Sequence, residues 1–90
     1  MSEFGRFLAN TIEAGRPSFQ EGTIQFFGWV DRPTDGQKVG IFKEDIFGQV
    51  GVMTLENWKK AAEGDVGGFL EEDRKMAVSF AQRVVQAYPG

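Results

Sequence analysis

Between residues 22 and 53 the sequence alternates three runs of β-branched and aromatic residues with two short breaks. The runs cover residues 22–30, 37–42 and 49–53, and the breaks read "DRPTDG" and "KEDIFG". Runs of this composition are typical of strands, and breaks this short join neighbouring strands into antiparallel hairpins. The sequence therefore predicts a three-stranded antiparallel meander.

The sequence predicts helices before and after the meander. Residues 3–14 place their apolar side chains along one side of a helix, with Ser2 as a candidate N-cap. Residues 55–64 follow Thr54, a second candidate N-cap, and residues 69–87 have an apolar arc wide enough to contact both the sheet and another helix. The predicted fold class is α+β, with an N-terminal helix, the meander and two C-terminal helices packed on the sheet.

The composition suits one small core without disulfides. The chain has 90 residues with nine Phe, two Trp and no Cys. Without disulfides, the bulky rings have to supply enough buried area to stabilise a small core. No shift in composition divides the chain, and we expect a single domain over residues 1–90.

The residue types exclude most familiar catalytic and metal chemistry. Without His or Cys the chain cannot form a conventional Ser–His or Cys–His nucleophile or a typical zinc site. A calcium loop starting at Asp31 fails, because Pro33 and Phe42 occupy ligand positions. The glycine spacings match no phosphate-binding motif. We therefore expect no enzyme, metal or cofactor, and we expect Glu44 and Asp45 to lie in a solvated turn.

Charge and hydropathy indicate the compartment and the partners. The start "MSEFGRFLAN" lacks a basic segment followed by a long apolar run, and no stretch approaches a membrane span. A cytoplasmic protein without membrane contact is the expectation. The net charge of −3 comes from scattered residues, so no basic block points to nucleic acid.

Strand alternation divides the apolar residues of the meander between two faces. We expect one face to be core and the other, smaller cluster to be either a partner interface or a surface partly covered by the N-terminal helix. The predicted core face is Ile24, Phe26, Val30, Val39, Ile41, Val50 and Val52, and the opposite cluster is Phe27, Trp29, Phe42 and Met53.

Acidic residues without neighbouring bases mark the segment between residues 61 and 73. One interpretation is a solvated connection that ends in the favourable first turn of a helix. The other is a docking patch for a basic surface, because clustered negative charge steers association. The candidate residues, called the acidic run below, are Glu63, Asp65, Glu71 and Glu72.

These observations favour a small non-catalytic module that binds a protein partner and occludes its surface, as inhibitors or accessory proteins do. Size and composition suit such proteins, including phage inhibitors, with Phe27 and Trp29 as aromatic anchors. A homodimeric structural or adaptor protein is one alternative. A single-stranded nucleic-acid binder that stacks bases on the rings of "QFFGWV" is another, although the basic groove that such binders need is missing.

Overall fold

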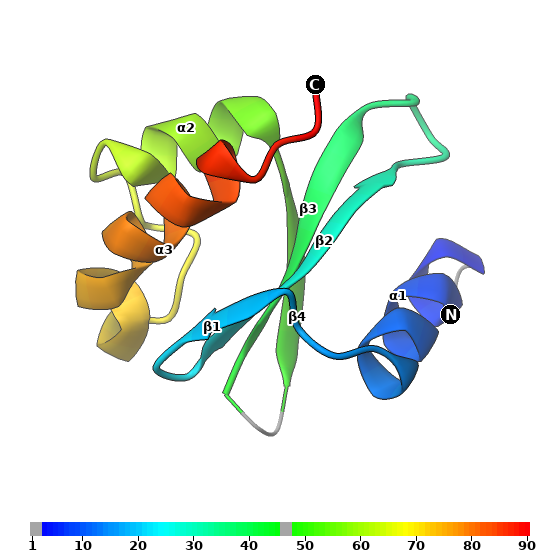
Figure 1. Cartoon of the computed structure of the whole chain (residues 1–90), viewed down its shortest axis with the longest axis horizontal. Coiled ribbons are helices and arrows are strands. Elements are labelled where there is room, and N and C mark those ends of the chain that lie inside the picture. Colours follow the sequence, from blue (N-terminus) through cyan, green and yellow to red (C-terminus); the bar gives the residue numbers. More distant parts are fainter. Residues whose placement is uncertain (1–2, 46–47) are drawn as a thin grey trace.

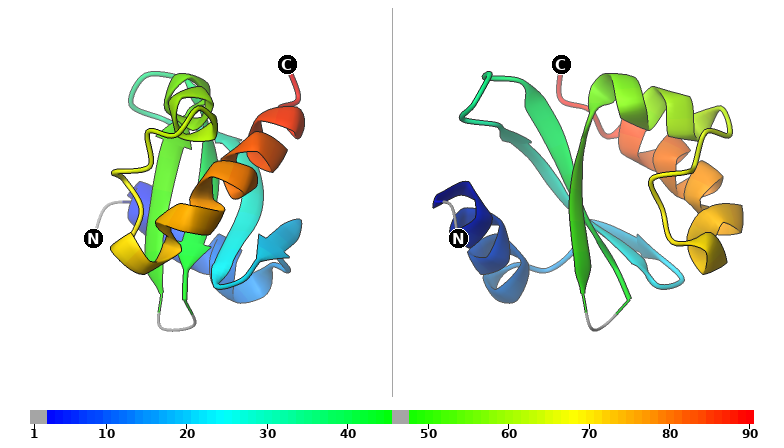
Figure 2. Two further views of the ribbon diagram at one scale, coloured as in Figure 1. Left: turned by 90° about the vertical axis from the view of Figure 1, so that its left-hand side faces the viewer. Right: turned by 180° about the vertical axis from the view of Figure 1, so that it is seen from behind.

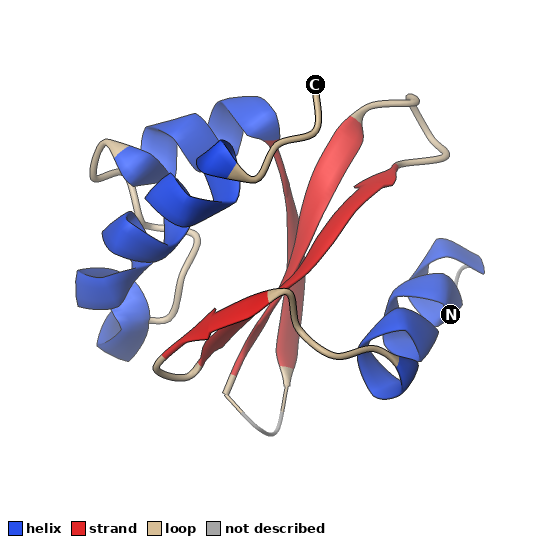
Figure 3. Ribbon diagram, viewed as in Figure 1, coloured by secondary structure: helices blue, strands red, loops and turns tan. Residues whose placement is uncertain are grey.

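A computed structural model describes residues 3–45 and 48–90, and in these residues helices flank both faces of a four-stranded antiparallel sheet (Figures 1 and 3). The strands are β1 (Phe19–Glu21), β2 (Ile24–Asp31), β3 (Lys38–Glu44) and β4 (Gln49–Thr54), and each pairs with the next along the chain. The helical elements are α1 (Glu3–Ala14), α2 (Leu55–Ala62), the 3₁₀ turn η1 (Glu71–Asp73) and α3 (Arg74–Gln86). Two helices, α2 and α3, lie together on one face, whereas α1 lies on the opposite face (Figures 1 and 2).

The predicted α+β class, with an N-terminal helix, an antiparallel sheet and C-terminal helices, is confirmed, but the predicted number of strands is wrong. The additional strand β1 pairs with β2 and sets Phe19 opposite Phe26. The sequence indicates no strand here, because the three residues of β1 are too few to show an alternation and follow soon after Pro17. Gly22 has a φ of 57°, which allows the tight turn that returns the chain into β2. The predicted N-cap Ser2 lies outside the described residues.

A β-bulge in β2 changes which residues share a face. Phe26 pairs with Phe42, but the next partners are Gly28 with Ile41 and Trp29 with Gly40, so one extra residue is inserted. An inserted residue reverses the alternation beyond it. Trp29 therefore lies on the same face as Phe26. The predicted division of the sheet into a valine-rich core face and an aromatic outer face is wrong.

The face below α2 and α3 holds the aromatic core. Phe26 and Phe42 meet the buried Trp58 of α2 edge to face, with ring centroids 6.1 Å and 5.3 Å away. Further buried members come from α2, α3 and the segment between them: Ala61, Phe69, Ala77, Phe80, Ala81 and Val84. This face is closed by two packed helices, which hold its rings in place.

The opposite face is covered less completely. Val39 and Ile41 are fully buried there, and the register places Val50 and Val52 on the same face. No residue of α1 is buried, and Phe7 remains 47% exposed. At the edge strand, Val50 is 44% exposed. One helix of 12 residues thus leaves part of this apolar layer open to solvent.

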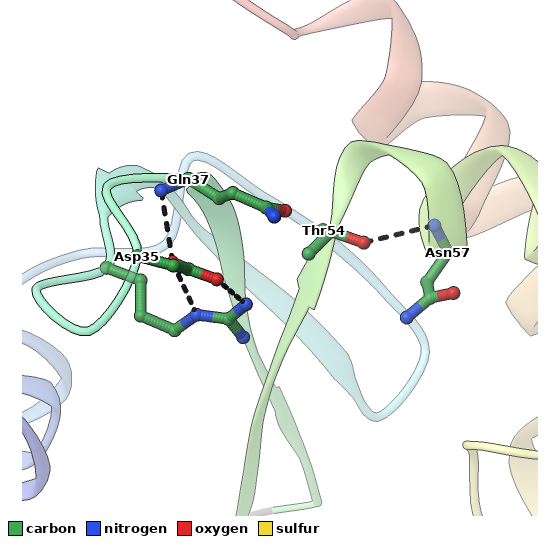
Figure 4. Close-up of polar contacts among 5 residues, drawn as sticks. Asp35, Gln37, Thr54 and Asn57 are labelled. Carbon is green, nitrogen blue, oxygen red and sulfur yellow. Dashed lines mark hydrogen bonds and ion pairs between the residues drawn. The ribbon is translucent and has the colours of Figure 1, made fainter.

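Two helix starts test the sequence interpretation. Thr54 caps α2 as predicted, since its Oγ1 accepts a hydrogen bond of 3.4 Å from the backbone N–H of Asn57 (Figure 4). The last helix begins later than predicted, at Arg74 rather than at Phe69. The reason is that Phe69 inserts into the core and Leu70 is extended, with a ψ of 145°.

Candidate interaction surface

The four apolar residues of the predicted interface do not form one surface. Phe42 is only 4% exposed and belongs to the core below α2 and α3, and Met53 packs against the same core. Trp29 lies between Phe26 and Tyr88, with ring centroids 6.0 Å and 4.8 Å away. Phe27, which the bulge inserts after Phe26, is half-buried and does not belong to this core. Three of the four residues therefore pack at the core, and the expected interface cluster does not form.

The acidic run, by contrast, is exposed throughout. Glu63 caps the C-terminal end of α2, Asp65 follows in the loop, and Glu71 and Glu72 form the first part of η1. Asp65 and Met53 both line a hollow of about 220 Å³. The other lining residues are Asn57, Lys60 and Gly68. One predicted apolar residue and one predicted acid thus share a site.

A larger groove, of about 300 Å³, lies between the first two turns of α1 and the end of the β2–β3 hairpin. We call it the α1 groove, and its lining residues are Glu3, Phe4, Phe7, Asp31 and Pro33. The rings of Phe4 and Phe7 stack with centroids 6.2 Å apart. Sequence reasoning missed this groove. The apolar side of α1 was visible in the pattern, but the extent to which the sheet would cover it was not.

The rim of the α1 groove is acidic. Glu3 is exposed. The Asp31 carboxylate forms an ion pair with Lys38 across the hairpin, with 3.0 Å between Oδ1 and Nζ. Because both side chains that border the apolar floor are carboxylates, the groove suits an apolar group next to a positive charge. Such a pair of features is common where one protein recognises another.

Glu44 and Asp73 form a second arrangement that the sequence did not indicate. The expectation of a solvated turn is wrong for Glu44, which ends β3 and is 2% exposed, and Asp73 in η1 is 3% exposed. Burial first, and then the hydrogen bond with Asp73, raise the pKa of Glu44 from its ordinary 4.5 to about 7, although the bond from the Leu70 N–H acts in the opposite direction. The Leu70 N–H donates to Glu44 Oε2 at 2.8 Å, and the Thr23 hydroxyl donates to Asp73 Oδ1 at 2.7 Å.

In the turn "DRPTDG", which fails as a calcium loop, the Asp35 carboxylate accepts its hydrogen bonds from residues of the turn and the residue after it. The Arg32 guanidinium donates two hydrogen bonds to Asp35, and the backbone N–H of Gln37 donates a third at 3.1 Å (Figure 4). These bonds, first of all those from Arg32, hold the pKa of Asp35 below its usual value. Across residues 3–45 and 48–90 no three acidic side chains are grouped so that they could hold a metal ion.

Neither the helices nor comparison with known proteins indicates a class of function for this chain. None of the helices in the described part of the chain has the length and apolar character needed to cross a bilayer. Comparison with protein-family models, with curated proteins and with solved structures found no match. The function must therefore be argued from the geometry of the surface.

Proposed function

We propose that this chain is a non-catalytic protein-binding module that occludes a surface of a protein partner, in the manner of a small inhibitor or accessory protein, phage inhibitors included. The observation that carries the proposal is the exposure of Phe7 at the edge of the α1 groove. A large ring that stays nearly half exposed beside an apolar groove is a typical anchor for a partner.

The α1 groove supplies the specificity in this proposal. An apolar side chain of the partner would fill the space between Phe4, Phe7 and Pro33, and a Lys or Arg beside it would approach Glu3 and Asp31. Because no residue of α1 is buried, the helix can offer its side chains to a partner without disturbing the core. The partner surface is therefore apolar and basic.

The acidic run contributes at longer range. Its four carboxylates are exposed on the side of the molecule that carries α2 and η1, away from α1 (Figure 1). Together with the net charge of −3 they favour encounter with a basic partner and increase the association rate at low salt. Their role in the proposal is steering, because exposed charges add little to the affinity itself.

The nucleic-acid alternative receives less support from the structure. A stacking platform needs several rings on one exposed face. Phe26 is buried in the core, Trp29 packs against Phe26 and Tyr88, and Phe27 is half-buried. The rings of "QFFGWV" therefore do not line one path for bases.

The test is quantitative affinity purification from the native cell, followed by binding measurements with the purified partner. We expect one partner in stoichiometric amount, and Phe7→Ala should weaken its binding about tenfold to a hundredfold because the anchor is lost. Val50→Ala is the matched control, since Val50 is similarly exposed but lies on the edge strand. The absence of a stoichiometric partner, or equal binding by both variants, would refute the proposal.

A further inference from the structure

We infer that the free edge of β4 pairs with β4 of a second copy of this chain, antiparallel about a two-fold axis, so that the two sheets become one. This inference concerns a surface other than the α1 groove and does not depend on the proposed function. It begins from the position of β4 as the last strand of the sheet, with β3 as its neighbour on one side (Figure 2).

Edge strands normally carry features that prevent association, and β4 carries none of them. Charged residues, prolines, bulges or very short length usually protect an edge. The six residues "QVGVMT" contain no charge and no proline, and their register with β3 is regular along the whole strand. In the described residues the backbone of β4 makes its strand hydrogen bonds to β3, and its outer groups face away from the sheet.

The opposite edge shows what protection looks like in the same molecule. Strand β1 is three residues long and ends in Glu21. The Glu21 carboxylate accepts a hydrogen bond of 3.1 Å from Ser79 and forms an ion pair of 3.6 Å with Arg83, so α3 holds this edge. Of the two edges, β4 is therefore the one suited to accept another strand.

A second copy of β4 fits this edge when the two chains are related by a two-fold axis. A two-fold axis perpendicular to the sheet keeps each face continuous, so α1 of both copies would lie on one side and α2 with α3 on the other. A register centred on Gly51 then sets Val50 of each copy opposite Val52 of the other, on the face where Val50 is exposed. Valine pairs across strands are favourable, and no like charges meet because β4 has none.

The expected dimer is of modest strength. Stable interfaces bury about 1,200 to 2,000 Å² in total, and pairing along one strand of six residues supplies only part of this area. The partly covered apolar layer beside Val50 adds to it. We therefore expect a dimer that forms and dissociates with concentration rather than a permanent one.

The experiment is light scattering after size exclusion over a wide range of protein concentration, combined with hydrogen exchange. The mass should rise from 10.0 kDa towards twice that value. Val50→Lys should shift the midpoint to about tenfold higher concentration or more, because it places a charge against the partner's valine. Asn10→Lys, at an exposed position of α1 outside the α1 groove, should leave the midpoint unchanged.

Hydrogen exchange of the unmodified chain keeps the test independent of how the variants fold. Amides of β4 should gain protection as the concentration rises, whereas those of α1 should not. A monomer at every concentration would overturn the inference. So would a dimer that Val50→Lys leaves intact, a dimer that Asn10→Lys dissociates, or concentration-dependent protection that excludes β4.

Discussion

The carboxyl group of Glu44, at the end of β3, is hydrogen-bonded to that of Asp73 in η1, and both groups are buried. Two carboxylates cannot both be charged at such a distance without a large penalty, so the pair holds a proton below about pH 7, the pKa of Glu44. The Leu70 N–H and the Thr23 hydroxyl bind its outer oxygens. A protonated acid pair thus joins the sheet to the segment that leads into α3.

This pair predicts that the fold becomes less stable as pH rises through neutrality. The pKa of Glu44 is about 7 in the folded chain against an ordinary value of 4.5, so the folded state binds the proton more tightly. The contribution is complete below about pH 4.5 and is lost as pH rises through about 7, at a cost of roughly 3 kcal/mol. Urea unfolding at a series of pH values measures it, and a flat profile between these limits would contradict the assignment.

Glu44→Gln should remove this pH dependence and stabilise the protein above pH 7. The amide stays neutral, can accept the Leu70 N–H and can donate to Asp73, so the arrangement persists without a proton to lose. Glu63→Gln is the matched control, because Glu63 is exposed at the end of α2. A variant with the same pH profile as the original chain would show that Glu44 does not hold the proton.

Gly40→Ala should destabilise the fold by about 1 to 3 kcal/mol through overpacking. A methyl group at Gly40 would lie 2.7 Å from Trp58 Nε1 and 2.8 Å from the ring of Phe26, both of which are fixed in the core. Gly67→Ala is the control, since nothing lies within 4 Å of its methyl position. Equal unfolding midpoints for the two variants would mean that the core yields more than its packing indicates.

The sequence predicted elements with strong local signals and failed where long-range register decides. Thr54 before "LENWKKAA" has its own capping chemistry, so the start of α2 could be predicted. The bulge after Phe26 leaves no such mark, because valines and aromatic rings suit either face of a sheet covered on both sides. This one inserted residue placed Trp29 in the core layer, away from the predicted interface.

The candidate sites were harder to predict because they depend on how the elements pack, which the local sequence pattern does not show. Phe7 has the pattern of a core residue, and only the partial cover of the sheet by a single helix leaves it exposed. Glu44 and Asp73 are 29 positions apart in the sequence, and no local pattern indicates that folding brings their carboxyl groups together. The exposed acidic run was identifiable because surface charge depends little on register.

Trp58 provides a last prediction, which separates ring packing from hydrogen bonding in the core. Its Nε1–H is buried against Gly40 and has no hydrogen-bond partner in the described part of the chain. Such a donor costs about 1 to 3 kcal/mol. Trp58→Phe removes this donor while it keeps an aromatic ring among Phe26, Phe42 and Phe69, so the stability should change by no more than about 1 kcal/mol.

Trp58→Ala, in contrast, should lose about 3 to 5 kcal/mol because it leaves a large cavity at the centre of the core. Urea unfolding of both variants at one pH below neutrality, where the Glu44 and Asp73 pair retains its proton, gives the comparison. A Phe variant as unstable as the Ala variant would show that the indole N–H has a partner in solution and that the bond matters to the fold. A small loss for Phe and a large loss for Ala would show that Trp58 stabilises the fold through its area alone.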